Sequence, residues 1–251
     1  MLDFIKNEKD FLTGHIEDLS AKAVKSGRTA SRFLTPAEAR GIASRFAHRR
    51  DIILNFDGGY DGAERVRAVL LNPDCGSYER KKFFVALKIE FSRHETLGHR
   101  DILGAVMALG IERNTVGDIT ESPLALICLP ELSEYIINNF IKAGRAGVKL
   151  SKIDLKELKA KDENLIIKTH TVASLRLDAV LSASFGIPRG KAVGFIEAGR
   201  VSLNYEPCLN HSKEVGEGSI MSVRGFGRAK LLEIGGVSKK ERIFIKIGLY
   251  G

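Results

Sequence analysis

The residues best suited to chemistry are cations grouped in the last third of the chain. Arg189 and Lys191 follow Pro188, a residue suited to the first turn of a helix. Cations at that end are unfavourable for the helix dipole, whereas the free backbone N–H groups there favour a bound anion. The pattern predicts a phosphate-binding surface. Its candidate residues are Arg176, Arg189, Lys191, Arg200, Asn204, Arg224, Arg228 and Lys230.

Two short helices and a hairpin must position these cations. Ser174 is expected to cap the first helix, with Arg176 and Asp178 away from its buried face. The second helix begins at Pro188 and ends at Gly199, because proline suits a helix start and glycine a helix end. A basic hairpin is expected over residues 220–234, with glycines that let its backbone approach a partner closely.

Charge is concentrated in the same region. The chain has 251 residues and a net charge of +8. Residues 169–251 contain 12 basic and 7 acidic residues, so they hold +5 of it. A localised basic excess is typical of proteins that bind polyanions, and nucleic acid is the partner it favours. Three well-separated cysteines predict a reducing, cytoplasmic setting rather than a disulfide framework, and no apolar stretch is long enough for a membrane span.

The chain is expected to have an α+β fold in three parts. These are a helical N-terminal region (1–50), a ferredoxin-like α+β domain (51–168) and a C-terminal binding domain (169–251). Residues 156–164 are highly charged and predict a linker. The RRM fold stacks bases on aromatic side chains of its sheet. Three phenylalanines of the middle domain are candidates, although burial in the core is the favoured interpretation: Phe83, Phe84 and Phe91.

No catalytic, metal or cofactor motif is complete. The glycine-rich turn over residues 57–62 lacks the Gly-Lys-Ser/Thr ending of a phosphate loop. The tripeptide over residues 99–101 copies the start of a kinase catalytic loop, but the required Asn is replaced by Val106. Neither a Gly-x-Ser-x-Gly motif nor a Cys-x-x-Cys pair occurs. The sequence therefore predicts a protein that is not an enzyme, with no catalytic residues, no metal and no small-molecule cofactor.

The C-terminal residues resemble the S4 RNA-binding domain, also called the alphaL motif. The resemblance rests on Arg176-Leu177-Asp178 with Leu181, on Arg189 with Ala192, and on Gly199, Val201 and Asn204. Pro188 and Gly190 depart from it, since the S4 pattern has serines at both positions. The resemblance implies an RNA-binding domain that uses these arginines.

The whole chain resembles the YlmH-type proteins of bacterial cell-division gene clusters. The matching stretches are residues 56–60, 97–105, 117–119 and 224–228. In that family the hairpin usually reads Arg-Gly-Lys-Gly-Arg, so Phe226 replaces a cation with a surface for stacking. The resemblance implies an RRM-like middle domain, an RNA-binding end and a role in translation quality control. The implied partners are structured RNA, meaning rRNA with tRNA as a further candidate, and the ribosome, in particular its large subunit.

Two other interpretations stay open at this stage. One is an RNA-modifying enzyme such as a relative of pseudouridine synthases, whose catalytic loop also contains Arg-Leu-Asp. In that loop the Asp is followed by x-x-Thr-x-Gly, whereas Asp178 is followed by Ala179-Val180-Leu181-Ser182. The other is an interaction factor linked to cell division. Detection of bound rRNA would separate the interaction factor from an RNA-binding protein.

Overall fold

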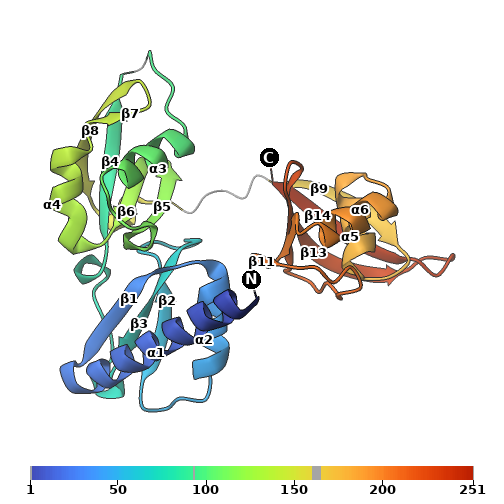
Figure 1. The fold of residues 1–251 in the computed structure, drawn as a ribbon, viewed down its shortest axis with the longest axis horizontal. Helices are drawn as coiled ribbons and strands as arrows, with labels where there is room; N and C mark the ends of the chain where they lie inside the picture. Colours follow the sequence, from blue (N-terminus) through green and yellow to red (C-terminus); the bar gives the residue numbers. More distant parts are fainter. Residues whose placement is uncertain (1, 93, 160–164, 251) are drawn as a thin grey trace. The chain divides into compact units, whose positions relative to one another are not determined.

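The computed structural model describes residues 2–92, 94–159 and 165–250 of the chain (Figure 1). These residues form two compact units, one up to residue 159 and one from residue 165. The first unit contains α1 (Leu2–Ser26), β1 (Arg28–Leu34), α2 (Pro36–Phe46), β2 (Ile53–Asp57), β3 (Val66–Leu71), β4 (Val85–Phe91), α3 (His99–Ala108), β5 (Val116–Glu121), β6 (Leu124–Cys128), α4 (Pro130–Asn139), β7 (Lys142–Ala143) and β8 (Ala146–Ile153). Its short 3₁₀ helices are η1 (Pro73–Cys75), η2 (Arg80–Lys82), η3 (Arg113–Thr115) and η4 (Leu155–Glu157).

The second unit contains β9 (Leu165–Val172), α5 (Leu177–Phe185), α6 (Arg189–Glu197), β10 (Val201–Leu203), β11 (Glu206–Pro207), β12 (Ile220–Val223), β13 (Gly227–Val237) and β14 (Ile243–Tyr250). The predicted α+β fold class is confirmed. Residues 156 and 157 of the predicted linker lie in η4 and Leu158 is buried, while residues 160–164 lie outside the described part. Among the described helices, none combines the length and apolar character that crossing a membrane requires.

The N-terminal part is built around a three-stranded antiparallel sheet in the order β1-β3-β2. Helices α1 and α2 cover one face, where Ile16 and Ile42 pack with Leu70 of β3 (Figure 1). The start of α2 is the predicted capping box, because Thr35 accepts a hydrogen bond from the Glu38 backbone while the Glu38 side chain accepts one from the Thr35 backbone.

The prediction of an all-helical N-terminal region was incomplete, because it missed strand β1. The inward side chains of this strand include Thr29 and Ser31, so the sequence shows little of the apolar alternation that predicts a strand. Both hydroxyls are instead satisfied inside the protein. Thr29 donates to the carbonyl of Leu19, and Ser31 accepts a hydrogen bond from the backbone of Ala68 in β3. Polar pairing thus replaces apolar burial at these positions.

The middle part follows the order β4-α3-β5-β6-α4-β8, and its antiparallel sheet has the strand order β5-β6-β4-β8-β7. This is the βαββαβ arrangement of ferredoxin-like domains, with β7 added at one edge. Helices α3 and α4 cover one face of the sheet, where Ile102 and Ile136 pack with Leu87 and Leu126. This strand order is compatible with the architecture predicted for the middle domain, but β2 and β3, which the predicted domain of residues 51–168 also included, belong to the N-terminal sheet.

The other face of this sheet is buried by the N-terminal sheet. Because successive side chains of a strand alternate between faces, Ala86 and Ile127 point away from α3 and α4 and pack with Phe33 and Val69 of the N-terminal sheet. Phe84 is 1% exposed, and its ring lies 5.9 Å from that of Phe33. RRM domains stack bases on the sheet face opposite their helices. Here that face is a protein core, and burial of Phe84 is confirmed.

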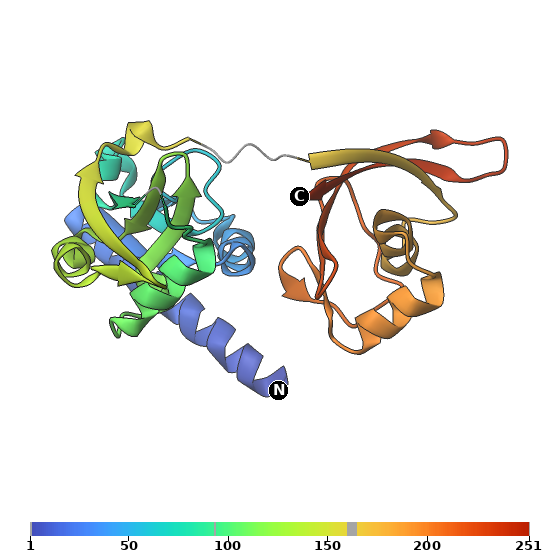
Figure 2. The ribbon, with the colours of Figure 1, turned by 90° about the horizontal axis from the view of Figure 1, so that it is seen from above.

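The second unit has one antiparallel sheet in the order β11-β10-β12-β13-β14-β9. Helices α5 and α6 lie against one face of it (Figure 2), where Leu177 and Leu181 pack with Ile245 and Ile247. Strand β9 pairs with β14 from Leu165 to Val172. It therefore crosses the predicted domain boundary between residues 168 and 169, and residues 165–168 are part of this sheet.

Candidate nucleic-acid interface

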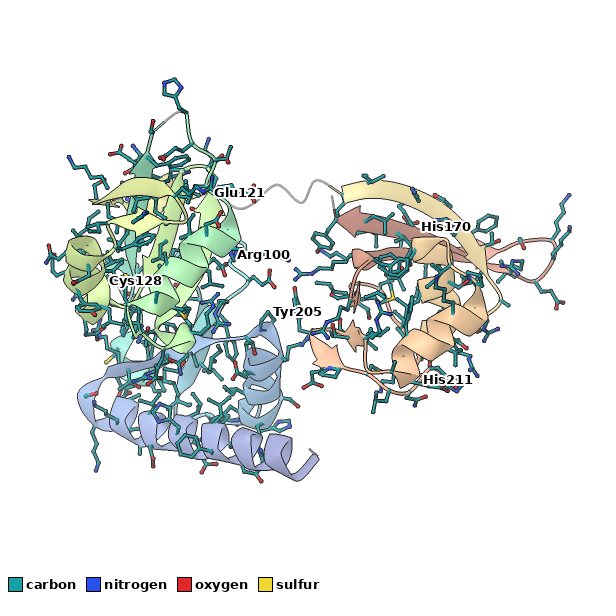
Figure 3. The ribbon with its side chains drawn as sticks, turned by 45° about the horizontal axis from the view of Figure 1, so that its top comes forward. Arg100, Glu121, Cys128, His170, Tyr205 and His211 are labelled. Carbon is teal, nitrogen blue, oxygen red and sulfur yellow. The ribbon has the colours of Figure 1, made fainter. Side chains whose placement is uncertain are left out.

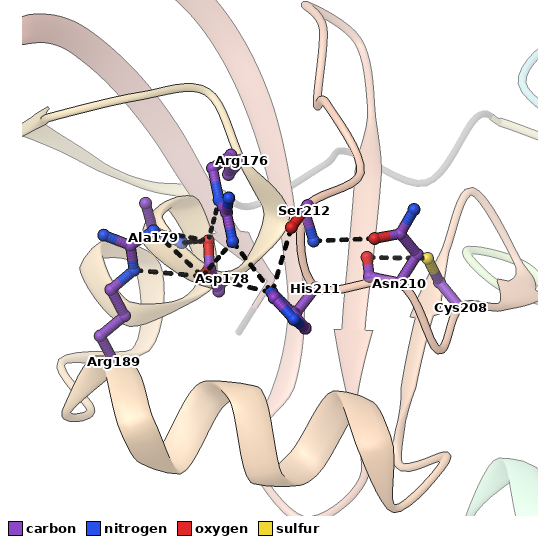
Figure 4. Close-up of polar contacts among 8 residues, drawn as sticks. All are labelled: Arg176, Asp178, Ala179, Arg189, Cys208, Asn210, His211 and Ser212. Carbon is purple, nitrogen blue, oxygen red and sulfur yellow. Dashed lines mark hydrogen bonds and ion pairs between the residues drawn. The ribbon is translucent and has the colours of Figure 1, made fainter.

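A buried carboxylate lies at the centre of the candidate site. Asp178 is in the first turn of α5, and its side chain is 3% exposed. Arg176 donates from Nε and Nη2 to its two oxygens over 3.2 Å, and Arg189 donates from Nε and Nη2 over 3.1–3.2 Å (Figure 4). The two arginine side chains are 38% and 49% exposed. One buried carboxylate thus holds two guanidinium groups at the surface.

This arrangement leaves a net positive charge. Two guanidinium groups share one carboxylate, and each has five N–H donors, of which Asp178 uses only some. Burial by itself raises the pKa of Asp178, but the hydrogen bonds and charges of Arg176 and Arg189 outweigh it and lower the pKa below its ordinary value. Asp178 is therefore ionised at neutral pH, and the group as a whole suits a phosphate.

Two expectations about the start of α5 were wrong. Ser174 does not cap the helix, because α5 begins at Leu177 with Arg176 as its N-cap. Asp178 was expected away from the buried face, yet it is buried. The physical reason is its pairing: the two arginines and the backbone N–H of Ala179 compensate the carboxylate for the loss of water. The spacing of apolar residues in a sequence indicates which apolar side chains are buried. It does not reveal a buried charge that is paired inside the protein.

Lys191 and Arg200 lie over aromatic rings, and Arg200 also contacts the backbone of Arg224. The Lys191 ammonium lies 5.8 Å from the ring centre of Phe195 and 5.9 Å from that of Phe226. The Arg200 guanidinium lies 4.4 Å from the Phe195 ring centre and donates to the carbonyl of Arg224 over 2.8 Å. Such cation–π contacts orient a cation without neutralising it. Positive charge therefore remains on α6 and on the turn between β12 and β13.

Of the remaining predicted residues, Arg228 and Lys230 lie on β13 and Asn204 lies in the turn between β10 and β11. The Arg228 guanidinium lies 5.3 Å from the Tyr205 ring centre and 5.5 Å from that of Tyr250 (Figure 3 labels Tyr205). Asn204 has a left-handed backbone, and its side-chain oxygen accepts a hydrogen bond from the Ile220 backbone over 2.9 Å. That oxygen is engaged in an internal hydrogen bond with the start of β12, and a contact of Asn204 with RNA stays a prediction. Lys230 is partly exposed on β13.

The candidate cations line more than one groove. Arg200 and Arg224 line one groove, and Arg228 lines a second. Arg189 lines a third together with Arg242, whose guanidinium donates to the carbonyl of Thr171 over 2.6 Å. These grooves all belong to the second unit. The surface thus offers several candidate anion-binding positions, each lined by arginine side chains.

Two residues of this surface were not identified from the sequence. His211 accepts a hydrogen bond from Nη2 of Arg176 through Nδ1 over 2.9 Å (Figures 3 and 4). Arg242 follows two lysines at the tip of the β13–β14 hairpin, and this basic run was the signal that could have found it. No comparable signal marks His211, because its contact with Arg176 depends on a fold that brings residues 35 apart together.

The glycine-rich turn over residues 57–62 has a structural role. Asp57 accepts hydrogen bonds from the hydroxyl of Tyr78 over 2.6 Å and from Nε of Arg80 over 2.9 Å. Asp118 accepts one from the hydroxyl of Tyr60 over 3.0 Å. These carboxylates hold the loop between β2 and β3 in place. Within the described ranges, no group of three or more His, Cys, Asp or Glu side chains is arranged to hold a metal ion.

The architecture of the second unit and its basic surface define an S4-type domain, and the comparisons agree. Residues 175–220 match the S4 domain profile, and residues 79–157 match the profile described as "Putative RNA-binding domain in YlmH". The chain is 34% identical over 245 residues to "Ribosome-associated protein quality control protein P2" of Bacillus subtilis (strain 168), covering 95% of this chain and 94% of the relative. The chain belongs to the YlmH-type family.

A solved structure is also similar. "Cell division protein ylmH from Streptococcus pneumoniae" is 24% identical, with a TM-score of 0.46. The match covers 60% of this chain and 90% of that one.

Proposed function

We propose that this protein binds structured ribosomal RNA on the ribosome, without catalysing a reaction, and acts in translation quality control. Large-subunit rRNA is the proposed target, with the adjoining tRNA as a further one, and the cytoplasm is the proposed compartment. The observation that carries the proposal is the Arg176–Asp178–Arg189 group in a domain that matches S4. The name of the Bacillus subtilis relative supports the ribosomal setting.

The same geometry favours binding over catalysis by Asp178. A pseudouridine synthase needs an aspartate that can attack its substrate. Here Asp178 is 3% exposed, and both of its oxygens accept hydrogen bonds from two guanidinium groups. Its carboxylate is therefore engaged in positioning the arginines. The proposal that the protein is not an enzyme rests on this engagement and on the families matched.

The proposal is tested by sedimentation of the full chain with ribosomal subunits, followed by binding to purified rRNA across a range of salt concentrations. Cosedimentation with large subunits is expected. Affinity for rRNA should fall steeply with salt, because each phosphate neutralised by a cation releases counterions and contributes about −0.7 to −0.9 to the slope of log K against log salt. Binding only to proteins of the cell-division machinery, with no bound rRNA, would refute the proposal.

A further inference from the structure

A groove in the second unit has a different character from the anion-binding positions around it. It has a volume of about 370 Å³ and lies between β9, the end of α5, the β12–β13 turn and the end of β14. This volume is within the range of about 300–1,000 Å³ typical of small-molecule sites. The side chains that give it its chemistry are Lys168, His170, Phe185, Phe226, Arg228 and Tyr250.

Aromatic rings form a platform at the edge of this groove. Phe226 is 42% exposed, although it lies between Phe185 and Phe195 at ring-centre distances of 6.3 and 5.3 Å. The turn fixes its backbone: Gly225 and Gly227 have φ angles of +89° and +111°, and the Phe226 N–H donates to the carbonyl of Val223 over 3.0 Å. An exposed ring held in this way can stack on another flat group at a small entropic cost.

The groove also offers positive charge, and one of its lining residues has an unsatisfied polar atom. Lys168 is exposed on β9, and the Arg228 guanidinium is held against Tyr250 at 5.5 Å from its ring centre. Nε2 of His170 is buried and has no hydrogen-bond partner in the structure (Figure 3 labels His170). Buried polar atoms normally have a partner. A ligand with a flat ring and a phosphate would complement the exposed ring of Phe226 and the two cations Lys168 and Arg228.

We propose that this groove holds one unpaired nucleobase of the bound RNA, stacked on Phe226, with its phosphate near Lys168 and Arg228. This inference rests on the proposed RNA-binding function and deepens it. A base inside a duplex presents no free face, so only an unpaired nucleotide can stack on a side chain. The anion-binding positions would hold the duplex backbone, and the groove would select RNA that has a bulged or looped-out base beside the duplex.

The test uses the full chain and two RNA hairpins that differ by one base. One hairpin carries a single bulged nucleotide, and the other carries an abasic residue there, so the phosphate charge is the same. The parent protein should bind the base-bearing hairpin more tightly by about 5- to 150-fold, the range expected for stacking of one base on an aromatic side chain. Phe226→Ala should bind both hairpins equally. Phe244→Ala is the matched control, because Phe244 is also 42% exposed, and it should keep the preference.

A fluorescence measurement tests the stacking itself. The chain contains no tryptophan, so Phe226→Trp introduces a single fluorophore at the edge of the groove. Its emission should be quenched by the base-bearing hairpin and not by the abasic one. Equal binding of both hairpins by the parent, or a preference that survives Phe226→Ala, would overturn the base site alone. Failure of the parent to bind any RNA, rRNA included, would contradict the proposed function as well.

Discussion

Arg189, the first residue of α6, donates hydrogen bonds to the buried carboxylate of Asp178 at the start of α5. The contact joins the N-terminal ends of two helices, where backbone N–H groups are free to bind anions. Asp178 therefore contributes twice. It compensates the partial positive charge at the start of its own helix, and it fixes the direction in which two guanidinium groups face the solvent.

The first prediction concerns Asp178→Asn. The substitution keeps the shape of the side chain but removes the charge that holds Arg176 and Arg189. We expect the free energy of unfolding to fall by about 1–3 kcal/mol, a charge-assisted hydrogen-bond effect moderated by the exposure of the arginines. Denaturant unfolding measures the loss. Unchanged stability, together with unchanged RNA affinity, would show that Asp178 does not position the arginines.

The second prediction is the pH dependence of this contribution. The pKa of Asp178 is lowered in the folded state from the ordinary value of 3.8. The ionised form is thus stabilised by folding, and the contribution is fully present above the unfolded pKa and lost as pH falls through the lower folded pKa. The stability difference between the parent and Asp178→Asn should therefore be constant from about pH 5 to 7 and shrink below about pH 3.8. A difference that grows on acidification would contradict this assignment.

The third prediction is that Arg189→Ala weakens RNA binding by about 1–3 kcal/mol, as expected for loss of a charge-assisted hydrogen bond. The sequence alone predicts unharmed folding for this variant and allows a small gain in helix stability, because the conflict with the helix dipole is relieved. The contact with Asp178 changes that expectation, and we predict a loss of up to about 1 kcal/mol, because the Arg189 side chain is 49% exposed. Equilibrium binding and denaturant unfolding measure the two effects.

A matched control for Arg189→Ala lies in the first unit. Arg49 also forms a two-point ion pair, with Asp51, and its side chain is 37% exposed. Arg49→Ala removes a similar charge and a similar contact, and we expect it to leave RNA affinity unchanged. Lys161, the control that the sequence suggested, lies outside the described residues. Equal weakening by Arg49→Ala and Arg189→Ala would mean that net charge, and not the site, governs binding.

The fourth prediction concerns the covered sheet of the middle part. Phe84 is 1% exposed and packs against Phe33. Phe84→Ala should lower the free energy of unfolding by about 3–5 kcal/mol, the range for removal of a buried phenylalanine. Because the sheet face is a core, RNA affinity of the folded protein should not change. A variant that folds stably but loses RNA affinity would show that this face is a binding surface.

The sequence was most informative where local chemistry decides the structure. Thr35 and Glu38 predicted the start of α2, and Gly199 predicted the end of α6, because capping depends on neighbouring residues. The hairpin carrying Arg224 and Arg228 also lies where it was expected. Local sequence signals were therefore sufficient to locate the elements that present most of the candidate cations.

Contacts between residues that are far apart in the sequence could not be predicted from local signals. Strand β1 was missed because Thr29 and Ser31 satisfy buried hydrogen bonds instead of adding to an apolar pattern. The face of the middle sheet opposite α3 and α4 is buried by contacts between two sheets. The residue pattern of one strand does not reveal such contacts. Within the site, the cations were identified individually. Their organisation around Asp178 and around Phe226 required the fold, since these contacts join separate helices and strands.

The second unit is the part of the chain that we expect to contact ribosomal RNA through its basic surface. Ultraviolet crosslinking of the full chain on large ribosomal subunits, followed by identification of the crosslinked peptides, tests this expectation most directly. We expect crosslinks within residues 165–250, concentrated on α5, α6 and the β12–β13 turn. Crosslinks confined to residues 2–159, with none in the second unit, would contradict it.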